Sequence, residues 1–274
     1  MYIDSHQHFW KLSRGDYTWM SEDYTSLFKD FDSNDLRPLI KQKNITKTVI
    51  VQAADTISES EFILDIANKT DFVSGVVGWV NFEDKNVKND IDRLSQNSYL
   101  KGFRPMIHDI EDVNWMLKEE IKEGIEYLNT NNLTFDALVR PHHLENLLIF
   151  AKKYESLPIV IDHIAKPKII DGEIDKWKND MKKLSQLDNI FCKYSGILTE
   201  VGENYKKEQI LPYIDYIFEI FSTKKIMWGS DWPVLTMAEN YLTWFDIAFD
   251  FTQSLSKDEK DNVFSKTATN FYKL

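Results

Sequence analysis

The chain has 274 residues and a formal net charge of −11, from 33 Lys and Arg against 44 Asp and Glu. This acidic balance, with no basic run along the chain, argues against a surface that binds nucleic acid or an anionic membrane. Hydrophobic residues make up 43% of the chain, which is enough for a sizeable core. The length suits one domain that spans residues 1–274.

The cysteine content and the absence of long apolar segments indicate that the protein is cytoplasmic. Cys192 is the single cysteine, so no intramolecular disulfide can form, as is usual in a reducing cytosol. The N-terminus lacks a basic region followed by an apolar one, and no apolar stretch reaches the roughly 18 residues that a membrane span needs. We therefore expect a soluble cytoplasmic protein whose partner is a small-molecule substrate, not a membrane or a nucleic acid.

Short runs rich in β-branched and aromatic residues alternate with segments of helical periodicity. The expected strands are residues 2–6, 48–53, 76–82, 100–104, 135–140, 158–163, 190–196 and 225–231. The expected helices are residues 58–69, 86–97, 144–154, 175–187 and 209–221. Ser58 and Glu61 have the spacing of a capping box at the start of the first of these helices.

This alternation predicts an α/β fold with parallel strands, and eight such units in about 250 residues match a (β/α)8 TIM barrel. An open doubly wound sheet is the alternative, although no Gly-x-Gly-x-x-Gly follows a strand. The extended aromatic segment 9–31 after the first strand is too long for an ordinary βα loop. It is either a lid over the barrel mouth or a hydrophobic cluster packed on the rim, and both can hold.

Polar residues gather at the carboxyl ends of the expected strands, where TIM barrels carry their chemistry. The first strand ends in His-Gln-His, and side chains two residues apart on a strand face the same way. Independent structural roles would scatter such residues over both ends of the barrel, so we favour a catalytic site. The residues are His6, His8, Arg104, Arg140, His163 and Asp231.

Each of these residues also has a structural interpretation when taken alone. An arginine at a strand end is often solvated, His163 could be a hydrogen-bonded core histidine, and Asp231 could cap a helix. Asp162 is expected to orient a neighbour. Lys193 on the seventh strand is either catalytic or directed outward, and His108 is given no role.

Longer phrases carry a family resemblance from the first residues to the end of the chain. They are IDSHQHFW, DYTWM, GFRP, LVRPHHL, DHIAKP, KYSG and WGSDWPV. In this order they resemble the amidohydrolase superfamily of metal-dependent hydrolases. The resemblance is to the branch of L-fuconolactonase, L-rhamnono-lactonase and 2-pyrone-4,6-dicarboxylate lactonase. It implies a TIM barrel whose site opens a small cyclic ester.

The resemblance also implies roles for individual residues. His6, His8, His163 and Asp231 would form the catalytic centre, with His6, His8 and Asp231 as ligands of a divalent metal ion, zinc or manganese. Members with two ions use a bridging lysine on the fourth strand. No lysine ends the fourth or fifth strand here, so at most one ion is expected. Some lactonases of this branch work without metal, so metal-free catalysis is the alternative.

The substrate pocket is expected to contain Arg104, Arg140 and His142, with Trp19 and Trp232 as aromatic walls. Arginine side chains suit the hydroxyls or the carboxylate of a substrate. Only two arginines clearly stand at strand ends, which favours a neutral sugar lactone over a dicarboxylate.

These expectations define a reaction, the hydrolysis of a sugar 1,4- or 1,5-lactone in carbohydrate metabolism. Asp231 would take a proton from water and later return it to the ring oxygen, while His163 orients the carbonyl or the water, or shares a metal ion. Two alternatives are a metal-dependent decarboxylase of the same superfamily and a ligand-binding relative without catalysis. A serine hydrolase is disfavoured because the chain lacks a Gly-x-Ser-x-Gly elbow.

Overall fold

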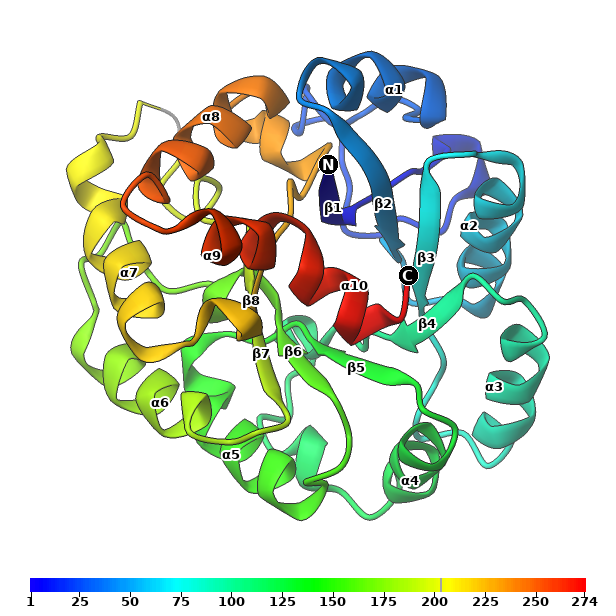
Figure 1. Ribbon diagram of the computed structural model, residues 1–274. Helices are drawn as coiled ribbons and strands as arrows, with labels where there is room; N and C mark the ends of the chain where they lie inside the picture. Colours follow the sequence, from blue (N-terminus) through cyan, green and yellow to red (C-terminus); the bar gives the residue numbers. More distant parts are fainter. Residues whose placement is uncertain (203) are drawn as a thin grey trace.

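Eight parallel strands form a single sheet in the order β1 to β8, and the helices surround it (Figure 1). This architecture comes from a computed structural model that describes residues 1–202 and 204–274. The strands are almost wholly buried, as parallel strands covered by helices must be. They are β1 (Tyr2–Gln7), β2 (Ile45–Val51), β3 (Val73–Gly78), β4 (Leu100–Phe103), β5 (Thr134–Ala137), β6 (Ile159–Ile161), β7 (Ile190–Tyr194) and β8 (Ile226–Trp228).

The five expected helices are present, and every helix except that of residues 257–261 buries side chains on one face. They are α1 (Ser33–Gln42), α2 (Ile57–Lys69), α3 (Val87–Ser95), α4 (Lys122–Thr130), α5 (Leu144–Lys153), α6 (Asp175–Ser185), α7 (Lys207–Ile220), α8 (Tyr241–Phe251), α9 (Lys257–Asp261) and α10 (Thr267–Tyr272). The predicted cap of α2 is wrong by two residues. Thr56, not Ser58, accepts a hydrogen bond from the Glu59 amide, at 3.0 Å.

The two edges of the sheet meet between β8 and β1, which closes the barrel and excludes the open-sheet alternative. The Asp231 amide donates to the carbonyl of His6 at 2.8 Å, and the His8 amide donates to the carbonyl of Trp232 at 2.7 Å. Gly229 permits this approach, since a Cβ there would lie 2.7 Å from the Cβ of His6. The predicted TIM barrel is confirmed.

An apolar plug fills the end of the barrel where the strands begin. Helix α10, red in Figure 1, crosses this end, and both chain termini lie there. Phe271 and Tyr272 of α10 pack against side chains from the barrel interior. Those interior residues are Ile3, Val49, Val51, Val77, Val160 and Met227. We call this end the floor and the opposite end, where the strands finish, the mouth.

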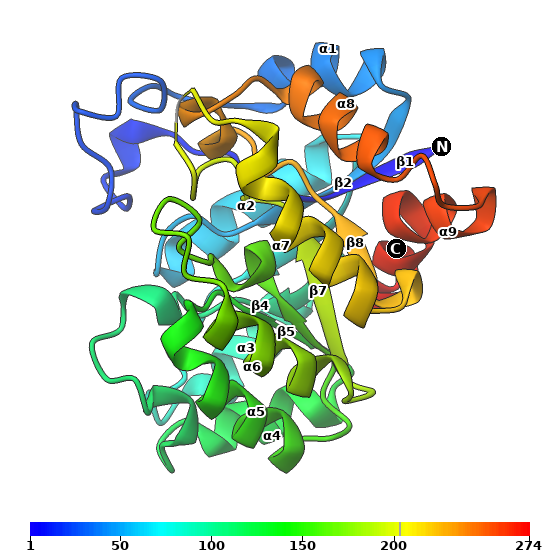
Figure 2. The same cartoon turned by 90° about the vertical axis from the view of Figure 1, so that its left-hand side faces the viewer.

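The segment of residues 9–31 lies at the mouth, on the far side of the molecule from the termini (Figure 2). It packs as a cluster on the rim. The Trp10 ring is buried and lies 5.3 Å from the Phe31 ring, and its indole nitrogen donates to the carbonyl of Lys29 at 2.8 Å. Trp19 and Tyr24 of the same segment line the cavity described below. The segment is therefore both a rim cluster and part of a wall.

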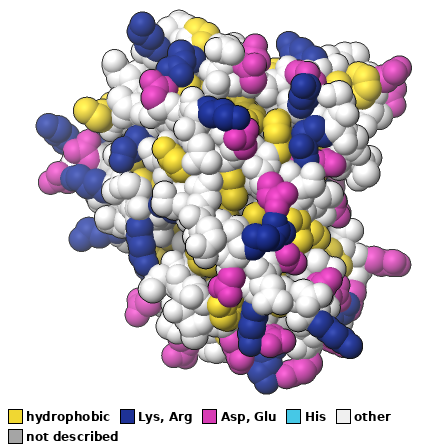
Figure 3. All heavy atoms as spheres, turned by 90° about the vertical axis from the view of Figure 1, so that its right-hand side faces the viewer, with side chains coloured by type: hydrophobic (Ala, Val, Ile, Leu, Met, Phe, Trp, Pro, Cys, Tyr) yellow, Lys and Arg dark blue, Asp and Glu magenta, His cyan; other side chains and the backbone are white. Residues whose placement is uncertain are grey.

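The outer surface mixes charges of both signs. Figure 3 shows acidic and basic side chains interspersed over the face that includes α2, α3 and α4. Arg93 of α3 pairs with Glu61 of α2, and the Nζ of Lys88 lies 2.6 Å from Glu123 Oε1 of α4. Among the described residues, none of the helices combines the length and the apolar character that a membrane crossing requires.

Candidate active site

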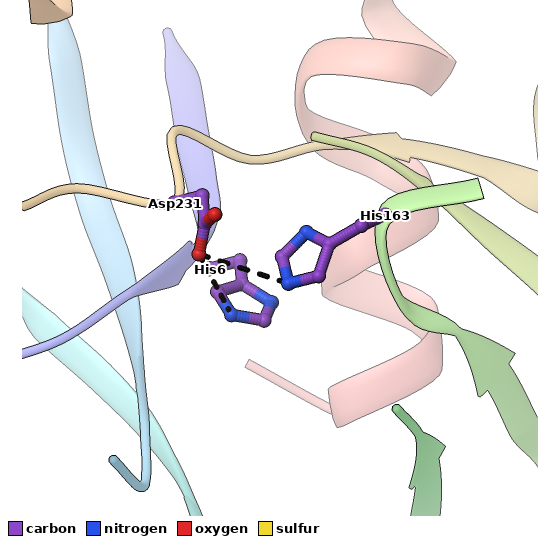
Figure 4. A group of neighbouring side chains, drawn as sticks. All are labelled: His6, His163 and Asp231. Carbon is purple, nitrogen blue, oxygen red and sulfur yellow. Dashed lines mark ion pairs between the residues drawn. The ribbon is translucent and has the colours of Figure 1, made fainter. Parts of the chain in front are cut away.

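Side chains from three strand ends converge at the mouth. His6 belongs to β1, His163 follows β6, and Asp231 follows β8, and all three point toward one another (Figure 4). His8 comes directly after β1 and shares the face of His6. These four side chains are almost wholly buried.

Asp231 is the centre of this group. Its Oδ1 atom lies 3.3 Å from Nε2 of His8, 3.6 Å from Nε2 of His6 and 3.7 Å from Nε2 of His163. One carboxylate oxygen therefore faces three imidazole nitrogens. The positions of all four residues follow from the strand ends that the sequence indicated.

Two of these residues have a left-handed backbone conformation that could not be predicted from the sequence. His163 and Asp231 have φ angles of 52° and 59°, in the left-handed region that costs an ordinary residue roughly 1–2 kcal/mol. The left-handed conformation continues through Ile164, Ala165 and Lys166. Trp177 holds this turn by donating from its indole nitrogen to the Ile164 carbonyl at 2.8 Å. The turn aims the His163 ring into the mouth.

Gly196 makes room for the His163 ring. Its φ angle is 63°, and a Cβ at this position would lie 2.5 Å from the ring. Ser195, the neighbouring residue, has its hydroxyl oxygen 2.9 Å from Nδ1 of His163. The Tyr-Ser-Gly phrase after β7 thus shapes the site, although we assigned it no role from the sequence.

Hydrogen bonds determine which ring nitrogen of His8 carries the proton. Nδ1 of His8 lies 2.7 Å from the carbonyl oxygen of Val51. A carbonyl can only accept, so Nδ1 donates, and in the neutral ring Nε2 carries the lone pair. That lone pair faces His6 and Asp231, whose nearest atoms lie 3.2 and 3.3 Å away.

Burial controls the charges in this group. Burial, together with the positive charge of Lys193, lowers the pKa of His6 well below its ordinary value. Burial likewise lowers the pKa of His163 well below its ordinary value. Burial alone would raise the pKa of Asp231, but His163 and His8 bring it below the ordinary value. At neutral pH the Asp231 carboxylate therefore faces the neutral rings of His6 and His163.

A cavity of 320 Å³ opens beside these residues. His8, His163 and Asp231 form part of its lining, whereas His6 lies behind them with no exposed surface. Three of the expected substrate contacts, Trp19, Arg104 and Arg140, also line it. Residues that we did not anticipate complete the wall, among them Tyr24, Met106, His108, Lys166 and Glu200.

Two expected substrate contacts lie elsewhere. Trp232 is buried in the rim cluster, with its ring 5.2 Å from that of Phe31 and 6.1 Å from that of Phe9. His142 is exposed and lines a neighbouring hollow outside the site. Of the phrase LVRPHHL, Leu138 and Arg140 reach the cavity wall, and His142 does not.

Arg104 contacts the histidine cluster as well as the cavity. One terminal nitrogen lies 3.4 Å from Nε2 of His6 and 3.4 Å from Oδ2 of Asp162. The other terminal nitrogen donates to the carbonyl of Gln52, whose side-chain amide donates back to the Arg104 carbonyl at 2.7 Å. This reciprocal pair fixes the guanidinium between the cavity and His6.

The interpretation of Lys193 as an outward-facing lysine is wrong. Its side chain lies inside the barrel without exposed surface, and its Nζ is 3.0 Å from Nδ1 of His6. Asp162 lies beside it, with 2.9 Å between Nζ and Oδ1. Burial alone would raise the pKa of Asp162, but Lys193 and His6 hold it well below the ordinary value.

The donor set fits a divalent metal ion. His6, His163 and Asp231 each offer one ligand atom, and these atoms lie within 4.8 Å of one another. Two imidazoles and a carboxylate are ligands that zinc and manganese accept. His8 adds the lone pair of Nε2 at the same place. The group includes His163, which was expected either to orient the substrate or to share a metal ion.

Comparison with known proteins assigns the family. The family model described as amidohydrolase matches residues 3–274. An L-fucono-1,5-lactonase from Burkholderia ambifaria is 36% identical over 278 residues, which cover 99% of this chain and 95% of that protein. A second L-fucono-1,5-lactonase, from Burkholderia multivorans, is 28% identical over 99% of this chain and 96% of its own.

A solved structure agrees in fold, and it contains zinc. The structure of an amidohydrolase from Burkholderia multivorans with bound zinc has a TM-score of 0.93 and is 27% identical, over 100% of this chain and 99% of the other. The family model covers nearly the whole sequence, and the superfamily that the motifs indicated is confirmed. The chain therefore belongs to the amidohydrolase family and is a hydrolase.

Proposed function

We propose that this chain hydrolyses the ester bond of a small sugar lactone, most simply a 1,5-lactone. The observation that carries the proposal is Asp231 Oδ1, 3.3–3.7 Å from three imidazole nitrogens at the wall of a 320 Å³ cavity. The lactonase relative at 36% identity supports this substrate class.

In the proposed reaction Asp231 activates water. The carboxylate accepts a proton from a water molecule, whose oxygen attacks the lactone carbonyl carbon. The ring C–O bond then breaks, and the proton moves from Asp231 to the departing ring oxygen. The product is a linear hydroxy acid. The lowered pKa of Asp231 keeps it ionised and ready to accept the first proton.

The remaining residues polarise and orient the carbonyl. His163 and His8 both lie on the cavity wall, and Arg104 supplies a fixed guanidinium nearby. Donors held in place before the reaction stabilise the oxyanion that forms on attack. A divalent cation held by His6, His163 and Asp231 would act as a Lewis acid on the same carbonyl.

The cavity favours a neutral, hydroxyl-rich ring. Lys166 is paired with Glu200, so these two wall charges are balanced, and burial lowers the pKa of His108, so its ring adds no charge at neutral pH. Trp19 is held by a 2.7 Å bond from its indole nitrogen to the Ala53 carbonyl. A fixed aromatic ring in the wall offers a flat surface for one face of a sugar.

A panel of lactones tests this function. L-Fucono-1,5-lactone, its 1,4 isomer, other sugar lactones and 2-pyrone-4,6-dicarboxylate are assayed by proton release, corrected for the spontaneous rate. We expect the highest kcat/KM on a neutral 1,5-lactone. The assay is repeated after chelation and after addition of zinc or manganese, and loss and recovery of the rate would assign a metal to the site. Release of carbon dioxide from aromatic acids, or tight binding without turnover, would overturn the proposal.

A further inference from the structure

A buried chain of polar groups connects the floor of the barrel to the candidate active site. It starts at Tyr272 of α10, whose hydroxyl donates to Asp136 Oδ2 at 2.6 Å. The same carboxylate oxygen accepts from Lys193 Nζ at 2.6 Å, and Lys193 also lies 2.9 Å from Oδ1 of Asp162. Lys193, Asp136 and Asp162 have no exposed surface. The reaction proposed above uses none of these three groups.

Lys193 determines the direction of hydrogen bonding in the histidine cluster. Its Nζ lies 3.0 Å from Nδ1 of His6, and an ammonium group can only donate. Nδ1 of a neutral His6 then accepts, and the ring proton lies on Nε2. Nε2 of His6 is 3.2 Å from Nε2 of His8, which accepts because Nδ1 of His8 donates to the Val51 carbonyl. The chain Lys193, His6, His8, Val51 is thus satisfied in one direction. The Arg104 guanidinium also faces Nε2 of His6, but at 3.4 Å it is the longer of the two cationic contacts to the ring.

Asp162 favours the opposite tautomer of His6. A histidine that binds a metal through Nε2 carries its proton on Nδ1 and usually donates it to a carboxylate or carbonyl. Oδ1 of Asp162 is the available carboxylate, but it lies 3.6 Å from Nδ1, beyond hydrogen-bond distance. Lys193 is the closer partner, so its contact prevails.

We propose that Lys193 is a positioning residue that keeps the His6 proton on Nε2, directed at the mouth, and thereby lowers the affinity of the site for a divalent cation. Two effects act in the same direction. The tautomer withholds the His6 lone pair, and the ammonium charge repels a cation nearby. Asp136 and Tyr272 hold Lys193 in place. This inference rests on the site of the proposed function, but its test needs no lactone. The lactonase proposal and the proposal for Lys193 can therefore fail independently.

The first measurement is the tautomer of His6 in the metal-free protein. Long-range proton–nitrogen NMR spectra of the histidine rings identify which nitrogen is protonated, and a His6→Asn variant assigns the His6 signals. We expect the proton on Nε2 in the wild type. A proton on Nδ1 overturns the proposal.

The second measurement is the affinity for Co²⁺, followed by its visible absorption. The Asp136→Asn/Lys193→Met double variant removes one charge of each sign, so the buried site stays balanced. We expect it to bind Co²⁺ about 10–100-fold more tightly, the range by which groups behind metal ligands change affinity. Tyr272→Phe, which keeps the charges, should give a smaller increase. Lys88→Met, on an outer helix, is the control for loss of a distant charge.

Equal Co²⁺ affinity of the double variant and the wild type overturns the proposal. Circular dichroism and thermal unfolding establish that each variant is folded before titration. If the double variant does not fold, the wild-type tautomer and the Tyr272→Phe titration decide the matter. A proton on Nε2 together with tighter Co²⁺ binding by Tyr272→Phe supports the proposal, and unchanged Co²⁺ binding by Tyr272→Phe overturns it.

Discussion

The two ends of this barrel differ in composition and in backbone conformation. At the floor, Phe271 and Tyr272 of α10 close the barrel over an apolar layer. At the mouth, buried histidines, an aspartate and an arginine face one another, and His163 and Asp231 have left-handed backbone. The floor gains stability from burial, whereas the mouth holds polar groups whose burial costs stability. The comparison indicates that apolar burial at the floor offsets the free energy that the buried polar groups at the mouth cost.

The largest expected effect comes from Asp231→Asn at the mouth. Asparagine keeps the size and much of the hydrogen bonding but cannot accept the proton from water. We expect kcat to fall about 10³-fold, within the range of general acid–base contributions. The free energy of unfolding should stay equal or rise, because a buried charge is removed. Lactone assays and urea unfolding measure both, and turnover close to wild type would remove Asp231 from its proposed role.

The matching change at the floor is Phe271→Ala. Phe271 is 5% exposed, so truncation leaves a cavity and should cost about 3 kcal/mol of unfolding free energy. Activity per folded molecule should not change, since the floor lies away from the cavity. Phe28→Ala, at a 41% exposed position, is the control and should cost far less. If Phe271→Ala lowers kcat with little loss of stability, the floor does not serve stability alone, and the proposed difference in role between the two ends is wrong.

Gly196→Ala tests the steric fit behind His163. The added Cβ would lie 2.5 Å from the His163 ring, so the ring must move. A displacement of about 1 Å in a catalytic group can lower kcat about 100-fold. Gly172→Ala is the matched control, because its φ angle is also positive, at 67°, and the described residues leave open space within 4 Å of a Cβ there. Both variants should lose roughly 1 kcal/mol of stability, but the control should keep its kcat.

Glu59 at the start of α2 gives the smallest expected effect. Burial raises its pKa to about 8, although Ala53, Arg104 and Arg14 oppose the shift. The folded state therefore keeps a proton that the unfolded state releases above its pKa of about 4.3, so stability falls as pH rises toward 8. Glu59→Gln lacks this titration.

Between pH 5 and pH 7 the variant should gain about 2 kcal/mol relative to the wild type. Urea unfolding at several pH values measures the difference. Parallel pH profiles of the two proteins would show that Glu59 is ionised in the folded state.

The sequence predicted the barrel and the centre of the site because both follow from regular patterns. Eight strand-like runs alternate with helices, and His6, His8, His163 and Asp231 stand at the ends of three of these runs. The left-handed turn after β6 was not predictable, since Ile164, Ala165 and Lys166 are residue types that ordinarily avoid this conformation. Tertiary contacts such as the Trp177 bond to the Ile164 carbonyl impose it.

The direction in which a side chain points was the second feature that the sequence could not predict. Lys193 reads equally well as an inward or an outward residue, because strand alternation does not say which face is inside. Trp232 was expected on the cavity wall and lies instead among the rings of the rim cluster. In both cases the packing partners come from distant parts of the chain, including Asp136 for Lys193 and Phe31 for Trp232.

The closure of the barrel has a consequence for the order in which the protein is made. β1 brings His6 and His8, which are synthesised first, and the last strand, β8, leads into Asp231. The amide of Asp231 and the carbonyl of His6 also form the seam between these two strands. A nascent chain that has released seven strands from the ribosome thus carries both histidines without the carboxylate. Catalytic competence and the final seam of the barrel arise in the same event, late in synthesis.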